Sequence, residues 1–370
     1  MQEVSLWGYV LNSMQNLALF LIIFGFGLIE YTSERYQNFH ATPDDSKLEL
    51  LTFLGLLALV QPVIFVIVGA LGQRIAPQYH NAWAHWPLWA MVASLLIGDD
   101  MVQYWWHRVS HTPFLWPLHR AHHSAHYMSI RVTYRNNLFY FVPMPSFWIS
   151  GMLAYLGLGQ VYLVYVTVKL AVIMGAHCGV PWDAPLYRIK ALRPVMWAVE
   201  RVISTPATHW AHHAITNEDG VGFYKGNFGN LLFLWDVLFG SAHITRQYPP
   251  EVGLRDDQLF GEGRWHIEML FPVFKSQCEH SALGKERRIY YESGDIVAAP
   301  PLVLRLRVGL CPLAPLTGDY MSVVARLRCI ELTLSRFFSS SPAGALARPH
   351  LCWTGSLTRA AALMQPRQYG

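Results

Sequence analysis

Long apolar runs separated by short polar segments dominate the chain. The first run, Leu17 to Ile29, reaches a span length when Leu11 to Gln15 ahead of it are included, because a helix of about 20 apolar residues crosses a bilayer. The later runs cover Leu50–Gly72, Trp86–Trp106, Leu138–Leu158 and Val161–Ala176. We therefore predict an all-α, polytopic helical membrane protein with four to five spans.

Two interruptions refine this layout. Gln61-Pro62 falls inside the second run, where a membrane helix tolerates proline as a kink. Only the segment 157–160 separates the last two runs, which predicts an antiparallel membrane hairpin at about 138–176. Lys169 lies within its second arm. A charge at that depth faces protein or water, which leaves either a structural pairing or a catalytic role.

The same layout predicts that the histidine-rich segments share one membrane face. Histidines begin where the third run ends, and the hairpin returns the chain to that face at His177. The turn at 157–160 has no Lys or Arg. The histidine face, in contrast, carries Arg108, Arg120, Arg131, Arg135, Arg188, Lys190, Arg193 and Arg201. By the positive-inside rule, we predict a histidine-rich helical cap on the cytoplasmic face.

Composition agrees with a membrane protein. Charged residues make up 14% of the chain and hydrophobic residues 53%, whereas soluble domains are about a quarter charged; the mean hydropathy is +0.23. The net charge of +4 comes without a basic block, so nucleic acid is not an expected partner. The five cysteines form no CxxC pair, which disfavours a disulfide framework. The first residues lack a basic n-region and a cleavage site, so we expect no cleaved signal peptide.

Four regions follow from these patterns. We expect N-terminal membrane spans in 1–106, a histidine-bearing core in 107–245, an extension of that core in 246–280, and a tail in 281–370. Residues 296–370 contain eight arginines, no lysine and two acidic residues, without a span or a periodic core pattern. The tail is predicted to be a poorly ordered extension, or alternatively not to be native coding sequence.

Histidine supplies the candidate chemistry. An HxxxH pattern is followed by two HxxHH patterns, and together they comprise His107, His111, His119, His122, His123, His209, His212 and His213. Spacings of three and four residues place side chains on one helix face. Pro113 and Pro117 separate the first two patterns and predict a break between two helices. That break would let the histidine clusters converge on a common centre.

Chance does not account for these patterns. With 17 histidines in 370 residues, two HxxHH patterns are expected in well under about one such chain in a thousand. A pH sensor usually needs only a few histidines, so metal binding is the better interpretation. Imidazole suits zinc, copper, iron and nickel, and eight or nine ligands suit two ions rather than one. The HExxH pattern of zinc proteases is absent.

Three segments resemble a known family. "DMVQYWWHRVSH" (Asp100 to His111) resembles D-x-x-x-Y-W-x-H-R-x-x-H, "LHRAHHS" resembles an H-x-x-H-H box, and "NFGNLLFLWDVLFGS" resembles the stretch after the last box. The chain is similar over about residues 90–245 to the fatty acid hydroxylase/sterol desaturase superfamily of membrane di-iron oxygenases. Its segments look most like the bacterial sterol-desaturase-like and alkylglycerol-monooxygenase-like members.

The resemblance implies a cofactor and a reaction. Two irons would bind the eight box histidines and His177, with no catalytic residue beyond the metal centre. O2 would be the co-substrate, and a reductase, a ferredoxin or a pterin would deliver electrons. The chain would then hydroxylate or desaturate a C–H bond of a membrane lipid, which could be a sterol, a fatty acyl lipid or an ether lipid. The alternatives are a non-catalytic metal-binding protein or metal transporter, and a zinc-dependent membrane hydrolase.

Three further residues are candidates for support of the metal centre. Asp100 and Asp236 could orient imidazoles through the free N–H groups of the rings, although Asp236 could equally cap or pair locally. His126 follows the second box at an interval of three residues and could reach the same centre.

Overall fold

The computed structural model describes residues 6–33, 41–254 and 265–274, and the side chains from residue 14 onward. All of these residues belong to one unit, Met1–Pro301. The predicted tail at 281–370 lies outside the described residues, and the boundaries of the four expected regions remain predictions.

The described residues form helices and two isolated bridges, with no strand, which confirms the all-α prediction. The first half of the chain contains α1 (Leu6–Tyr31), α3 (Pro43–Gly55), η1 (Leu56–Val60), α4 (Gln61–Ile75), η2 (Pro77–Tyr79), α5 (Leu88–Leu95), η3 (Leu96–Met101), α6 (Val102–Ser110) and α7 (Trp116–His123). It is followed by η4 (Ile130–Tyr134), α8 (Leu138–Phe141), α9 (Pro145–Leu153), η5 (Ala154–Leu158), α10 (Gly159–His177), α11 (Ala184–Arg188), η6 (Lys190–Leu192), α12 (Arg193–Val202), α13 (Pro206–His212), α14 (Leu234–Phe239) and α15 (Trp265–Leu270).

Three helical stretches are long and apolar enough to cross a membrane, which supports a membrane protein. They are Met14–Tyr31, Pro43–Ile75 and Pro145–His177. The predicted run at 86–106 lies in α5, η3 and α6, which are continuous in sequence, but this stretch is not among the three. It includes two adjacent carboxyl groups, Asp99 and Asp100, in the π-helical turn η3. The predicted number of four to five spans is not confirmed.

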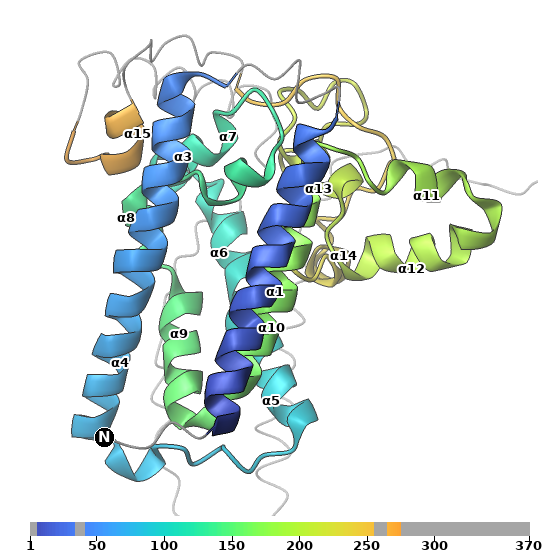
Figure 1. Ribbon diagram of the computed structural model, residues 1–370. Coiled ribbons are helices and arrows are strands. Elements are labelled where there is room, and N and C mark those ends of the chain that lie inside the picture. Colours follow the sequence, from blue (N-terminus) through green and yellow to red (C-terminus); the bar gives the residue numbers. More distant parts are fainter. Residues whose placement is uncertain (1–5, 34–40, 255–264, 275–370) are drawn as a thin grey trace, which may run out of the picture. The chain divides into compact units, whose positions relative to one another are not determined.

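Gly157 turns the chain between α9 and α10. Its φ of 113° is a conformation that favours glycine, and a Cβ there would lie 2.8 Å from the backbone nitrogen of Ala84. From this point α10 runs back alongside α1 toward the end where α7 and α13 lie (Figure 1). The turn falls where the sequence predicts the hairpin.

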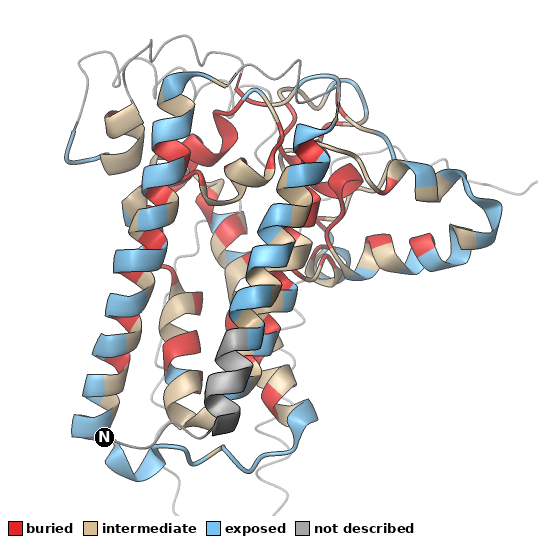
Figure 2. Cartoon of the chain, viewed as in Figure 1, coloured by how far each residue is buried: buried red, intermediate tan, exposed pale blue. Residues whose placement is uncertain are grey.

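The long helices pack along one stripe and expose the opposite one. On η1 and α4, Leu56, Val60, Ile64 and Val68 are buried and pack in a cluster with Met144 and neighbouring aromatic residues. The outward positions of these helices are exposed, as the alternation of red and pale blue in Figure 2 shows. Exposed leucine and valine on a span are what a lipid environment accepts, since the bilayer is itself apolar.

Buried residues gather at the end where the short helices α7 and α13 lie (Figure 2), and many of them are polar. One of them anchors α1 there. The Glu30 carboxylate accepts hydrogen bonds from Ser129 Oγ (2.8 Å), the Ile130 N–H (2.8 Å) and the Gly179 N–H (2.7 Å). The end of the first span is thereby fixed to the segments that follow α7 and α10, both of which contribute histidines to the candidate site.

Candidate metal centre

Four helices bring the predicted histidines to one place. His107 lies on α6 and His111 directly follows it, while α7 contains the first HxxHH pattern. His177 is the last residue of α10, and α13 with the residue after it contains the second HxxHH pattern. The predicted break between α6 and α7 is confirmed, because α6 ends at Ser110 and α7 begins at Trp116. The two helices can therefore approach the centre at different angles.

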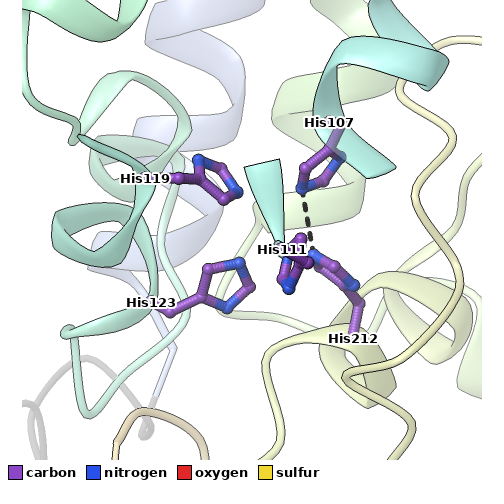
Figure 3. Close-up of side chains that lie close together, drawn as sticks. All are labelled: His107, His111, His119, His123 and His212. Carbon is purple, nitrogen blue, oxygen red and sulfur yellow. Dashed lines mark hydrogen bonds between the residues drawn. The ribbon is translucent and has the colours of Figure 1, made fainter. Parts of the chain in front are cut away.

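All nine histidines belong to one of two adjoining clusters, each with the side-chain donors needed to hold a metal ion. In each cluster the candidate ligand atoms lie within 4.8 Å of one another. The first cluster consists of His107, His111, His119, His123 and His212, whose rings converge in Figure 3. The second consists of His122, His177, His209 and His213. The clusters are neighbours, since the ring centroids of His123 and His213 are 4.4 Å apart.

Each HxxHH pattern contributes to both clusters. His119 and His123, four residues apart, belong to the first cluster, while His122 between them belongs to the second. In α13 the assignment is reversed, because His212 belongs to the first cluster and the pair His209 and His213 to the second. One helical pattern thus holds both clusters at a fixed separation, which the sequence spacing alone does not reveal.

Backbone carbonyls fix the orientation of four of these rings. Nδ1 of His107 donates to Phe228 O at 2.7 Å, and Nδ1 of His212 donates to Gly226 O at 2.7 Å. Nδ1 of His122 faces Arg135 O at 3.2 Å, and Nδ1 of His177 faces Ile173 O at 2.8 Å. Because a carbonyl can only accept, Nδ1 carries the hydrogen, and Nε2 of the neutral ring presents a lone pair.

These lone pairs point at one another without a proton between them. Nε2 of His107 lies 3.0 Å from Nε2 of His212, and Nε2 of His177 lies 3.4 Å from Nε2 of His122. Two acceptors at that distance repel unless a cation lies beside both. Nitrogens bound at about 2.1 Å to one ion, at right angles, would be about 3.0 Å apart. The observed spacing therefore fits two ligands of one metal ion.

Burial keeps the imidazoles in the form that binds metal. Burial lowers the pKa of His107 to about 4, against the opposing hydrogen bond to Phe228. The pKa values of His111, His122 and His212 are well below the usual value, first through burial and then through neighbouring histidines. Neutral imidazole is the metal-binding species. The Nε2 atoms of His111, His119 and His123 are buried without a hydrogen-bond partner among the described residues, which a bound cation would explain.

Asp236 acts on the backbone rather than on a histidine. Its carboxylate accepts from the N–H groups of Phe228 (2.9 Å) and Gly229 (2.6 Å) and from Ser241 Oγ (2.6 Å). It thereby fixes the loop whose carbonyls, Gly226 O and Phe228 O, receive the two imidazole N–H groups. Of the two roles that the sequence left open for Asp236, the described residues show the local pairing and not a direct contact with an imidazole, because backbone amides and Ser241 occupy the carboxylate.

Asp100 differs from the expectation in the same way. It accepts from Trp235 Nε1 (2.8 Å) and from the N–H groups of Leu231 (3.3 Å) and Leu232 (3.1 Å). Asp100 thus holds the next part of the same loop. His126, the third candidate, is exposed and belongs to neither cluster. Asp100, Asp236 and His126 therefore all lie outside the two histidine clusters.

The loop is also tied to α6. Tyr104, one turn before the first histidine, contacts Ser241 through the two hydroxyl groups at 2.7 Å, and Arg108 Nη1 donates to the Tyr104 hydroxyl at 2.9 Å. The D-x-x-x-Y-W-x-H-R segment and the stretch after the last box are therefore two halves of one hydrogen-bonded support.

The carbonyl acceptors are the part of the site that the sequence analysis missed. Gly226, Phe228, Arg135 and Ile173 contribute through backbone oxygens, so their side-chain types give no signal. Arg135 has a second task, since its guanidinium donates to Ala121 O (2.9 Å) and to Ser124 Oγ (2.9 Å) at the end of α7. That contact fixes the end of the helix that presents three of the histidines.

A cavity of about 120 Å³ extends from the histidines into the membrane helices. His107, His119, His122 and His177 line it at one end. Much of its remaining wall is apolar, with residues from η1, α9 and α10 and the segments beside them, including Leu56, Phe141, Met144, Phe147, Val166 and Leu170. An alkyl chain is the kind of molecule that such a wall accommodates.

Comparisons with known proteins agree with the geometry. Residues 92–241 match the family model described as fatty acid hydroxylase. Alkylglycerol monooxygenase from Danio rerio is 28% identical over 167 residues, which cover 44% of this chain and 31% of that protein. The Homo sapiens alkylglycerol monooxygenase is 26% identical over 158 residues, with coverage of 42% and 31%.

A bacterial relative covers more of both chains. Ornithine lipid hydroxylase OlsE from Rhizobium tropici is 25% identical over 242 residues, 59% of this chain and 61% of that protein. The chain spans about a third of the length of the alkylglycerol monooxygenases that it matches. No solved structure matches the chain. The match over residues 92–241, which include every histidine of the two clusters, therefore supports the fatty acid hydroxylase superfamily, and the relatives support its alkylglycerol monooxygenase-like branch.

Proposed function

We propose that this chain is a membrane-bound, O2-dependent monooxygenase that uses two iron ions to hydroxylate a C–H bond of a membrane lipid. The observation that supports it best is the convergence of nine imidazoles, two of them with opposed lone pairs 3.0 Å apart, at the end of a largely apolar cavity. Two relatives are named for the monooxygenation or hydroxylation of a lipid.

The ligands of the proposed irons are the histidines of the two clusters. His107, His111, His119, His123 and His212 would hold one ion, and His122, His177, His209 and His213 the other. No Asp, Glu or Cys of the described residues joins either cluster. Imidazole ligation suits iron as well as zinc and copper. The reaction needs a redox-active ion, which excludes zinc, and the match to the fatty acid hydroxylase family favours iron over copper.

Iron bound there would activate O2, so that R–H, O2, two electrons and two protons give R–OH and water. The electrons would come from a separate donor, which is a reductase, a ferredoxin or a pterin. The chain's own contribution is positional. Its carbonyls orient the imidazoles, and burial keeps bulk water from most of them, since eight of the nine histidines are at most 5% exposed. The apolar wall of the cavity would align the alkyl chain.

The proposed orientation places the metal centre on the cytoplasmic face. The histidine end of the helices is rich in arginine, whereas the hairpin turn at 157–160 has no Lys or Arg. This asymmetry is the one that the positive-inside rule associates with cytoplasmic loops. An electron donor in the cytoplasm would then reach the metal centre without crossing the bilayer.

Metal content and product together test the proposal. The purified protein should contain about two irons per chain, and lipid from cells that express it should gain one oxygen atom by mass spectrometry. His212→Ala should reduce both the iron content and the product. His85→Ala is the matched control, because His85 is exposed and outside both clusters.

Three results would contradict the proposal. One zinc per chain with full activity of His212→Ala would identify a different kind of metal protein. Tight iron binding without any oxygen-dependent change in lipid would favour a metal-binding protein or transporter. A product that has lost two hydrogens would show desaturation in place of hydroxylation.

A further inference from the structure

A buried ion pair lies at the membrane end of the cavity. The Lys169 ammonium on α10 pairs with the Asp99 carboxylate on η3, and both side chains line the cavity. They are 6% and 3% exposed. His177, eight residues after Lys169 on the same helix, is about 12 Å farther along the axis. The cavity thus has histidines at one end and an ion pair at the other.

Asp99 uses more of its hydrogen-bonding capacity than Lys169 does. The Asp99 carboxylate accepts from Ser150 Oγ (3.0 Å), from Tyr165 Oη (2.6 Å) and from Lys169. An ammonium has three N–H donors, and Asp99 is the only hydrogen-bond acceptor of Lys169 among the described residues. The Tyr165 ring lies 5.6 Å from Nζ and offers a weaker contact. Lys169 therefore has donor capacity left at the cavity wall.

A purely structural pair would not need that free capacity. A buried ion pair is costly, because desolvation opposes the attraction, and apolar side chains of similar volume often replace it without loss of stability. Ionisable residues within membrane segments usually mark a functional contact. Gln103 supports this interpretation. It lines the cavity one turn from His107, and its amide has no hydrogen-bond partner among the described residues.

The charges define the class of ligand. Asp99 already neutralises Lys169, and Asp100 is a further buried carboxyl group on η3. A second anion, such as a carboxylate or a phosphate, would meet a site without excess positive charge. A neutral oxygen, which only needs to accept a hydrogen bond, suits the remaining N–H groups of Lys169.

We propose that Lys169, held by Asp99, donates a hydrogen bond to a neutral oxygen atom of the lipid in the cavity, such as a hydroxyl, ether or ester carbonyl oxygen. This rests on the proposed function, because it names a feature of that reaction's substrate. Lys169 would select oxygen-bearing chains over plain hydrocarbons, while the apolar wall accepts either.

Competition binding tests this inference without turnover. Tritiated 1-hexadecanol is bound to the purified full-length protein in detergent and displaced with unlabelled 1-hexadecanol, hexadecane or hexadecanoate. The wild type should bind 1-hexadecanol about 10- to 100-fold more tightly than hexadecane, as expected for a hydrogen bond to a charged group. In the double variant Asp99→Leu/Lys169→Met, the ratio of the affinity for 1-hexadecanol to the affinity for hexadecane should fall to within about threefold of unity.

A matched control and a second double variant complete the test. Thr167 lies on the same helix outside the cavity lining, and within the described part of the chain its hydroxyl donates only to Leu163 O. Thr167→Val should therefore keep the wild-type ratio. If the apolar pair does not fold, Asp99→Asn/Lys169→Gln removes both charges and should lower the ratio about tenfold.

The outcomes separate this inference from the proposed function. The inference is overturned, even when lipid product is formed, if the wild type binds hexadecane with the same affinity as 1-hexadecanol. It is also overturned if the wild type binds hexadecanoate more tightly than 1-hexadecanol. An unchanged ratio in the double variants also overturns it. Absence of iron and product, together with an intact preference for 1-hexadecanol, would instead contradict the proposed function alone.

Discussion

The imidazoles of the candidate metal centre depend on residues that belong to neither cluster of candidate ligands. Asp236 is the clearest example, because it holds the N–H groups of Phe228 and Gly229 while Phe228 O receives the N–H of His107. The carboxylate thus positions the backbone of the loop, and the loop backbone in turn orients the imidazole. Asp236 can be found in the sequence because it lies in a recognisable pattern. The backbone amides that it binds cannot be found there, because they depend on how the loop folds back.

Asp236→Asn should weaken metal binding by about 10- to 100-fold, the usual effect of losing a partner that orients a ligand. Asparagine has a single acceptor oxygen, so it cannot satisfy both backbone N–H groups and Ser241. Metal affinity measured by titration with a competing chelator would show the change. Glu251→Gln, an exposed acid, should bind metal like the wild type, and equal affinities for both variants would refute the supporting role of Asp236.

The same carboxyl group should give the metal-free protein a pH dependence. Burial raises the pKa of Asp236 from 3.8 to about 6, although hydrogen bonds from Ser241, Phe228 and Gly229 oppose the shift. Between these two pH values the folded state binds more protons than the unfolded state, so this group's contribution to stability falls as pH rises. Over that window the contribution decreases by about 3 kcal/mol.

Thermal unfolding of the wild type and of Asp236→Asn, each from pH 4 to 7, isolates this contribution. The wild type should lose stability relative to the variant as pH rises through about 6, because asparagine does not titrate. Parallel curves for the two proteins across that window would show that the pKa of Asp236 is not raised.

At the level of secondary structure, breaks and irregular turns in the helices determine the directions in which side chains point. The gap between α6 and α7 lets two histidine patterns face each other, and the π-helical turn η3 contains two consecutive acids with different partners. Asp99 binds Lys169, whereas Asp100 binds the loop after residue 230. Prolines signalled the first break in the sequence. No residue type signals the second, because a π-turn forms where packing requires it.

Gly157→Ala should destabilise the protein by about 1–3 kcal/mol, the range for strain at an unfavourable backbone conformation. The added Cβ would be forced into φ 113° and against the Ala84 nitrogen at 2.8 Å. Gly159→Ala is the matched control, since nothing lies within 4 Å of a Cβ there, and it should be neutral or slightly stabilising. Denaturation in mixed micelles measures both, and equal stabilities of the two variants would rule out strain at Gly157.

At the scale of the whole molecule, the metal centre connects segments that lie far apart in the sequence. His107 and His212 are 105 residues apart, yet their Nε2 atoms approach to 3.0 Å. Four helices end at this point, and neutral lone pairs alone do not hold them together. Bound metal would therefore act as a cross-link in the folded state.

Removal of the metal should lower the thermal stability of the whole chain. A ligand that binds only the folded state stabilises it by about 2.7 kcal/mol at a concentration 100 times its Kd. Treatment with a chelator should lower the unfolding temperature, and addition of ferrous iron should restore it. In His212→Ala the chelator should have a much smaller effect. The same response in His212→Ala as in the wild type would place the stabilising metal elsewhere.

Hydropathy, spacing and proline act locally, so the membrane-helical class, the eight box histidines and the break between α6 and α7 could be predicted from the sequence. His177 followed only from the resemblance to a known family. The tertiary structure alone decided how each HxxHH pattern divides between two clusters, which carbonyls orient the rings, and that Lys169 meets Asp99 70 residues away. Those features arise from contacts between distant segments, and residue spacing along one helix contains no information about its partner.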